Sequence, residues 1–137
     1  MKRVIFTTYD DIEKENDKWS MNHYATEQVN EYFDRLIANK EEYANSLINV
    51  EFKMYHNTMV DFDVDAGLEF TKANLYKHHL MAELAEDYDE VMYVDIDVVF
   101  NTEKNVFDEL DLEQGIHIQT QTDKVTSTDI EGVMFES

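Results

Sequence analysis

Residues 86–102 read EDYDEVMYVDIDVVFNT, an apolar run that contains two aspartates, Asp95 and Asp97, one residue apart. The run from Val91 to Val94 favours a buried strand, and two strand residues that are two positions apart point to the same side. Two carboxylates about 6 to 7 Å apart in a partly dehydrated site repel each other unless a cation or hydrogen bonds compensate. The pair therefore predicts a divalent metal site; a helix cap next to an exposed strand end is the structural alternative.

The segments around this stretch alternate between strand and helix patterns. Period-two or β-branched and aromatic runs predict further strands over residues 3–9, 49–56, 115–122 and 132–137. Apolar residues at helical spacing predict helices over residues 22–39, 40–47, 68–86 and 103–110. Thr102 is the expected cap of the last helix. Strands separated by helices predict an α/β fold, a mostly parallel sheet with helices on its faces.

The composition favours one acidic domain. The 137 residues suffice for a single core, and 43% apolar residues argue against disorder. The 31 acidic and 11 basic residues give a net charge of -20. Such a surface repels nucleic acid and anionic lipid, so we expect neither as a partner. A negatively charged ligand would need a cation or a local basic spot, which makes metal dependence plausible.

Residue usage also bears on the compartment. The chain has no cysteine, which excludes disulfides, zinc-thiolate sites and thiol catalysis and fits a reducing compartment. We expect no membrane span, because no run approaches the roughly 20 apolar residues that one requires. The amino-terminal apolar stretch is too short for a signal-peptide core, so the expected location is cytoplasmic. The sequence is compatible with a homo-oligomer and does not require one.

One family resembles this chain. The run YDEVMYVDIDVVFNTEKNVFDEL, residues 88–110, is similar to the metal-binding D-x-D segment of nucleotide-sugar-dependent glycosyltransferases of the GT-A fold. Those proteins have an apolar strand, D-x-D, a few apolar residues and a short helix. TTYDD at residues 7–11, the lysine-bearing helix before the D-x-D strand, and EGVMFES at residues 131–137 also look like parts of that family. The resemblance implies a single GT-A-like, Rossmann-like domain over residues 1–137.

The resemblance also implies roles for the two aspartates and for other residues. Asp97 would be the principal ligand of Mn²⁺ or Mg²⁺, and Asp95 would share the metal or hold the donor ribose. Lys77 would meet the diphosphate or the donor sugar, with Lys72 competing for that role. The residues expected around the nucleobase, the ribose and the sugar ring are Thr7, Thr8, Tyr9, Asp10, Glu131 and Gly132. The structural alternatives are a polar strand end for the first four and a solvated lysine for Lys77.

The implied activity is metal-dependent transfer of a sugar from a nucleotide-sugar donor, with uridine diphosphate sugars favoured, to an unidentified acceptor. The family usually supplies a third metal ligand and its acceptor site from a further carboxyl-terminal half, which we expect here to be short or missing. His117 is the one histidine after the D-x-D stretch, but a lone histidine on a strand is more often packed or on the surface. No catalytic base or nucleophile can be named.

Three other interpretations compete. A non-catalytic domain that binds only nucleotide or metal has the same pattern. DIDVV also fits the nucleophile segment of haloacid-dehalogenase-type phosphatases, although in that family the segment belongs to the first strand. Asp61, Asp63 and Asp65 have calcium-loop spacing, but the loop lacks glycine at its sixth position and has Lys72 where a bidentate glutamate belongs, which makes a calcium site the weaker interpretation.

Overall fold

A computed structural model describes residues 1–10, 20–65 and 69–117 of the chain. Its contacts fall into two compact units, residues 1–103 and 104–137, and each unit is considered by itself. Within the described residues, no helix combines the length and the apolar character that crossing a membrane would require.

The first unit is built on a three-stranded parallel sheet with the order β2-β1-β3. The strands are β1 (Arg3–Tyr9), β2 (Val50–His56) and β3 (Glu90–Tyr93). Ile5 of the central strand lies opposite Phe52 on one side and Met92 on the other. Parallel neighbours need long crossover connections, and here helices supply them.

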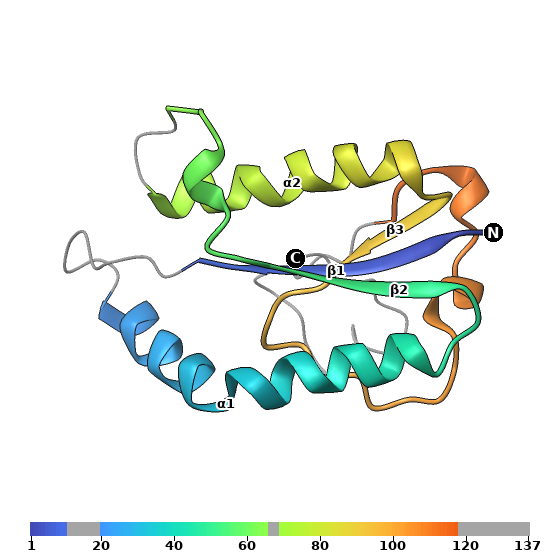
Figure 1. The fold of residues 1–137 in the computed structure, drawn as a ribbon, viewed down its shortest axis with the longest axis horizontal. Helices are drawn as coiled ribbons and strands as arrows, with labels where there is room; N and C mark the ends of the chain where they lie inside the picture. The colour runs from blue at the N-terminus through green and yellow to red at the C-terminus, as the bar shows by residue number, and fades with distance from the viewer. Residues whose placement is uncertain (11–19, 66–68, 118–137) are drawn as a thin grey trace, which may run out of the picture. The chain divides into compact units, whose positions relative to one another are not determined.

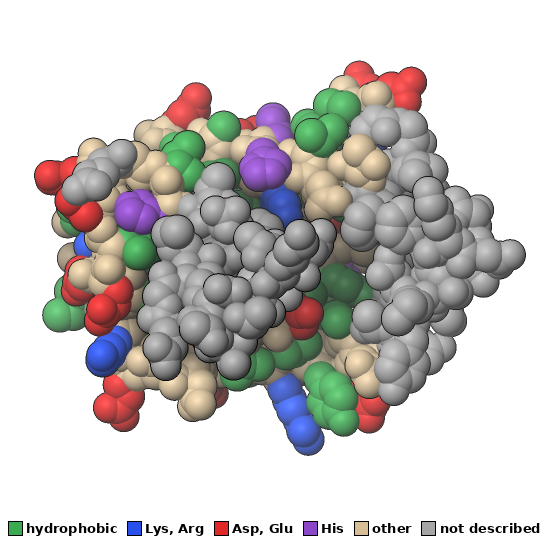
Figure 2. All heavy atoms as spheres, turned by 180° about the vertical axis from the view of Figure 1, so that it is seen from behind, with side chains coloured by type: hydrophobic (Ala, Val, Ile, Leu, Met, Phe, Trp, Pro, Cys, Tyr) green, Lys and Arg blue, Asp and Glu red, His purple; other side chains and the backbone are tan. Residues whose placement is uncertain are grey.

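Two helices cover opposite faces of this sheet, as Figure 1 shows. They are α1 (Ser20–Asn45), which packs mainly on β2, and α2 (Glu69–Asp87), which packs on β3 and β1. The observed architecture confirms the predicted α/β class, with a parallel sheet between flanking helices. Figure 2 shows acidic side chains at several separate places on one face, as expected from the net charge of -20.

The core on the α2 side of the sheet is an apolar cluster formed by alternate residues of β1 and one face of α2. Its buried members are Val4, Phe6, Met59, Tyr76, Leu80, Leu84 and Tyr88. Ile5 and Thr7 alternate with Val4 and Phe6 on β1 and are also fully buried, so the central strand has both faces covered. This double burial explains why the apolar residues Val4, Ile5 and Phe6 follow one another without a polar residue between them.

Most element boundaries agree with the sequence patterns. The strand expected over 3–9 is confirmed, and β2 begins one residue later than expected. The helices expected over 22–39 and 40–47 form the single helix α1, because no glycine or proline interrupts residues 20–45. The helix α2 is displaced by one residue at each end from the expected 68–86.

The stretch around the aspartates differs from the prediction. Strand β3 ends at Tyr93, and its four residues are partly rather than fully buried. Thr102 is not the cap of the following helix, which is a short 3₁₀-helix over Val106–Glu109. The cap is Asn105, whose side chain accepts a hydrogen bond from the Phe107 N–H at 3.0 Å.

Two predicted strands fall at the end of the described residues or beyond it. Residues 115–117 are not part of a strand, and the remainder of the strand predicted over 115–122 lies outside the described residues. The strand predicted over 132–137 lies outside them as well. In the described part of the second unit, a 3₁₀-helix over Leu112–Gln114 follows the one capped by Asn105.

Candidate functional site

The strand order places a switch point at the carboxyl end of β1. The chain passes from β1 to β2 on one side of the sheet, then returns to add β3 on the other side of β1. In open parallel sheets, ligands bind outside the carboxyl ends of the strands at the point where the order reverses. Here that point lies between the ends of β1 and β3, which carry Thr8 and Tyr93 respectively.

Asp95 and Asp97 lie immediately beyond β3. Both side chains are exposed, whereas Ile96 between them is buried. The Val98 N–H donates to the Asp95 carbonyl at 3.0 Å, which closes a turn over these residues. Because β3 has already ended, strand alternation does not set the directions of the two carboxylates. The prediction that Asp95 and Asp97 project from the same side of a strand is therefore wrong.

Tyr93 connects the aspartates to the rest of the sheet. Its hydroxyl donates to Asp95 Oδ1 at 2.7 Å, and its ring lies 5.3 Å from that of Phe6. Burial raises the pKa of the Tyr93 phenol, and the hydrogen bond to Asp95 and the negative charges of Asp95 and Asp97 raise it further, while a hydrogen bond with Thr8 opposes them. The phenol therefore stays protonated at neutral pH and acts as a donor to Asp95.

Lys77 of α2 reaches the same place. Its ammonium nitrogen lies 5.0 Å from the centre of the Tyr93 ring, a cation–π contact over a partly buried aromatic side chain. Of the two lysines that sequence reasoning left in competition, Lys77 is the one with this contact. Thr8, Lys77, Tyr93 and Asp95 thus converge from β1, α2 and the end of β3.

No family model, curated protein or solved structure matches this chain. Any function assigned to this chain therefore depends on the geometry of this site and on the resemblance noted for the D-x-D segment.

The other predicted residues at the end of β1 point to different neighbours. Thr7 is fully buried, and its hydroxyl oxygen has no hydrogen-bond partner among the described residues. The Tyr9 hydroxyl donates to Asn30 Oδ1 of α1 at 3.2 Å. Asp10 Oδ1 accepts the Met59 N–H at 3.2 Å, which ties the end of β1 to a 3₁₀-helix over Met59–Asp61. Of these four residues, Thr8 is the one that influences the pKa of the Tyr93 phenol.

An aromatic cluster that sequence reasoning missed lies beside Tyr9. The rings of Phe33 and His56 lie 5.7 Å and 5.9 Å from that of Tyr9, and 4.7 Å from each other. The three residues come from α1, from the last position of β2 and from the last position of β1. Their sequence positions carry no common motif, so only the parallel register, which sets Tyr9 opposite His56, reveals the cluster.

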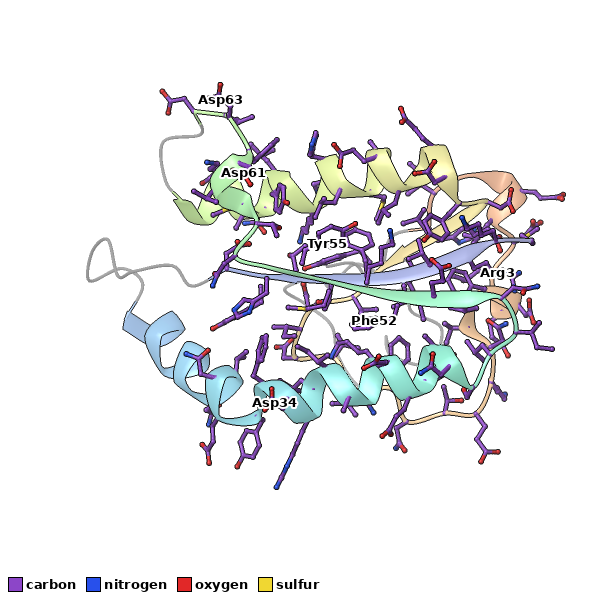
Figure 3. The ribbon with its side chains drawn as sticks, in the orientation of Figure 1. Arg3, Asp34, Phe52, Tyr55, Asp61 and Asp63 are labelled. Atoms are coloured by element: carbon purple, nitrogen blue, oxygen red, sulfur yellow. The ribbon has the colours of Figure 1, made fainter. Side chains whose placement is uncertain are left out.

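The remaining candidates lie elsewhere. Gly132 and Glu131 are outside the described residues. His117, in the second unit, is exposed, and its Nε2 lies 2.9 Å from the Asp111 carbonyl oxygen. In Figure 3, Asp61 and Asp63 lie on the connection that precedes α2, away from the sheet. Tyr55 and Phe52 in the same view flank opposite faces of the sheet.

The carboxylates at the site fit a hard divalent cation in part. Asp95 and Asp97 supply exposed oxygen ligands, the type that Mg²⁺ and Mn²⁺ prefer. Among the described residues no three histidine, aspartate or glutamate side chains gather closely enough to hold a metal ion together. Such a pair suits the binding mode in which one or two carboxylates and substrate phosphates share the ion, with water completing the coordination.

A hollow at the amino ends of the strands has no residue of the candidate site among its lining residues. It is lined by the start of the chain and by the beginning of β2, including Lys2, Asn49 and Glu51. Beside it, the Tyr88 hydroxyl donates to Glu51, and the ammonium of Lys2 lies 4.6 Å from the centre of the Tyr88 ring. Lys2 and Glu51 thus each contact Tyr88 at the amino ends of the strands, away from the switch point.

Proposed function

We propose that this chain is a metal-dependent glycosyltransferase of the GT-A type that takes its sugar from a nucleotide-sugar donor. The observation that carries the proposal is the convergence of Thr8, Lys77 and Tyr93 with Asp95 at the switch point of a parallel sheet. Support also comes from Asp97, which follows Asp95 on the same turn and completes the D-x-D pattern.

The proposed binding mode follows from charge. A chain with a net charge of -20 repels a diphosphate, so the donor needs positive charge at the site. Asp97, with Asp95, would hold Mn²⁺ or Mg²⁺, and the ion would share its coordination with the diphosphate oxygens. A bound divalent cation would also neutralise charge as the nucleoside diphosphate leaves. Lys77 would add a mobile positive charge over the ring of Tyr93.

The orientation of Asp95 is the second element of the proposal. The protonated Tyr93 hydroxyl occupies one oxygen of Asp95 at 2.7 Å, which leaves the other oxygen for a metal ion or for a ribose hydroxyl. Hydrogen-bond donors behind a ligating carboxylate fix its direction and tune its affinity. The Thr8 side chain acts on the same phenol, whose pKa it lowers.

A first experiment measures binding of uridine diphosphate by calorimetry in the presence of Mn²⁺ for the wild-type chain, Asp97→Asn and Asp63→Asn. We expect Asp97→Asn to abolish metal-dependent binding and to leave the chain folded, because the substitution keeps the size of the side chain and removes only its charge. Asp95→Asn should do milder damage. Asp63→Asn, an equal charge change on the exposed connection before α2, is the control and should bind as wild type.

A second experiment separates an enzyme from a domain that only binds. Release of uridine diphosphate from a panel of uridine diphosphate sugars is followed with Mn²⁺ present. We expect slow hydrolysis to be easier to detect than transfer to a defined acceptor, because hydrolysis needs only water as the nucleophile. Donor binding that depends on Asp97, without any turnover across the panel, would identify a non-catalytic nucleotide-binding domain instead.

A further inference from the structure

Lys40 of α1 is a fully buried lysine. Its side chain is 0% exposed, and its ammonium nitrogen donates to the Ile96 carbonyl at 2.7 Å and to the Leu36 carbonyl at 3.1 Å. Burying an ammonium group is costly unless hydrogen bonds and opposite charge compensate for the lost water. The Leu36 carbonyl belongs to the same helix, so the Ile96 carbonyl is the long-range partner of this lysine.

The Ile96 carbonyl lies between the two aspartates of the D-x-D segment. Ile96 is itself buried, whereas Asp95 and Asp97 on either side of it are exposed. The turn at this point is closed by the hydrogen bond from the Val98 N–H to the Asp95 carbonyl at 3.0 Å. The contact with Lys40 therefore fixes the peptide group that joins Ile96 to Asp97, directly behind the predicted metal ligand.

Neighbours of Lys40 on α1 fix the other end of the same segment. The Asn39 side chain accepts the Phe100 N–H at 2.8 Å and donates to the Phe100 carbonyl at 3.0 Å. The Tyr43 ring stacks on the Phe100 ring with centroids 4.0 Å apart and planes 5° from parallel. Less than two turns of helix thus hold residues 96–100 at both ends, although β3 has already ended.

Asp97 also acts on Lys40 electrostatically. Burial lowers the pKa of the Lys40 ammonium, and the negative charge of Asp97 opposes that shift. The negative charge of Asp97 therefore favours the charged form of the Lys40 ammonium. Two carbonyl oxygens and one nearby carboxylate make the charged form of Lys40 tolerable in a dry environment.

We propose that Lys40 is a positioning residue of this site, whose buried ammonium group holds the Ile96 carbonyl and thereby sets the turn from Asp95 to Asp97 for divalent-cation binding. The inference rests on the metal-dependent donor binding proposed above. Lys40 would touch neither the cation nor the donor, and would act only through the peptide group behind Asp97.

The direction in which Mn²⁺ affinity changes when Lys40 is replaced distinguishes a positioning role from simple charge repulsion. A positive charge near a cation site repels the cation, so repulsion alone predicts tighter Mn²⁺ binding when the charge is removed. A positioning role predicts weaker binding, because the turn loses the contact that fixes its geometry. Groups behind metal ligands typically contribute about 10- to 100-fold to metal affinity.

The test measures the Mn²⁺ dissociation constant from the electron paramagnetic resonance signal of free Mn²⁺. Lys40→Met is compared with wild type and with Lys53→Met, a matched control that removes one positive charge from an exposed position of β2. We expect Lys40→Met to weaken Mn²⁺ binding about tenfold or more. Lys53→Met should stay within about twofold of wild type, because exposed charges are screened by salt.

Urea unfolding without metal establishes that each variant is folded under the binding conditions. A folded Lys40→Met that binds Mn²⁺ as tightly as wild type, or more tightly, overturns the inference and leaves Lys40 a structural residue. Should Lys40→Met not fold, Lys40→Leu takes its place. It also lacks a donor for the Ile96 carbonyl, so the same loss of Mn²⁺ affinity is expected and an unchanged affinity again overturns the inference. A wild-type chain whose Mn²⁺ binding is absent, or is unaffected by Asp97→Asn, overturns the proposed function together with this inference.

Discussion

Removal of the Tyr93 hydroxyl is the most selective perturbation of the proposed site. Tyr93→Phe keeps the ring, and with it the contact with Phe6 at 5.3 Å and the position under the Lys77 ammonium. The substitution deletes the donor that Asp95 Oδ1 accepts at 2.7 Å and the hydrogen-bond partner of Thr8. Any change in metal binding can then be assigned to the orientation of Asp95.

The expected magnitude follows from the exposure of Asp95. A hydrogen bond to a charged group contributes about 1.5 to 3 kcal/mol when it is protected from water. Because the Asp95 side chain is exposed, we expect the free energy of unfolding to fall by only about 1 kcal/mol. Metal affinity should fall by about tenfold, the lower end of the range for partners behind metal ligands and equal to about 1.4 kcal/mol.

The assay combines Mn²⁺ titration by electron paramagnetic resonance with urea unfolding of the same samples. Tyr32→Phe is the control, since Tyr32 is exposed on α1 and its ring contacts the Arg35 guanidinium. The control should match wild type in both measurements. If Tyr93→Phe binds Mn²⁺ like the control, Asp95 does not depend on Tyr93, and the reasoning that joins them into one site is refuted.

Three further substitutions test separate contacts. Lys77→Met should weaken binding of uridine diphosphate with Mn²⁺ present by about tenfold while leaving Mn²⁺ binding unchanged; equal losses in both would contradict a diphosphate contact. Asn39→Ala should lower the free energy of unfolding by about 1 to 3 kcal/mol, because both backbone groups of Phe100 lose their partner; an unchanged urea midpoint would argue against this. A hydrogen bond to Glu51 raises the pKa of Tyr88 from 10.0 to about 12, so the folded state holds this proton more tightly than the unfolded state. The free energy of unfolding of the wild type should fall between pH 10 and pH 12, and that of Tyr88→Phe should fall less steeply. Identical slopes would refute this linkage between the Tyr88 proton and stability.

The elements that could be predicted from the sequence are those that local patterns determine. The apolar run of residues 3–9 gives the bounds of β1, and helical periodicity gives α2 to within one residue. The end of β3 at Tyr93 could not be predicted, because Val94 and Ile96 continue the apolar pattern on either side of Asp95 although the chain turns out of the sheet there. The cap was misplaced because Thr102 and Asn105 are both suitable residue types, and only the fold selects between them.

The residues of the candidate site also divide into those that the local sequence reveals and those that only the fold reveals. The sequence singles out Asp95 and Asp97, because charged residues after an apolar strand are unusual. It gives no sign of Lys40, whose helix position differs in no local feature from that of a solvated lysine. Its burial depends on the Ile96 carbonyl, 56 residues away in the chain. Tyr93 likewise reads as a core aromatic until the contacts with Thr8 and Lys77 are known.

The most direct test of the central claim is a thermal-shift measurement with uridine diphosphate in the presence of Mn²⁺ and, separately, of a chelator. A ligand that binds only the native state raises the melting temperature, by an amount that grows with its concentration over its dissociation constant. We predict that uridine diphosphate raises the melting temperature with Mn²⁺ and has no effect with the chelator. An equal rise under both conditions would contradict a site in which Asp95 and Asp97 hold the donor through a metal ion.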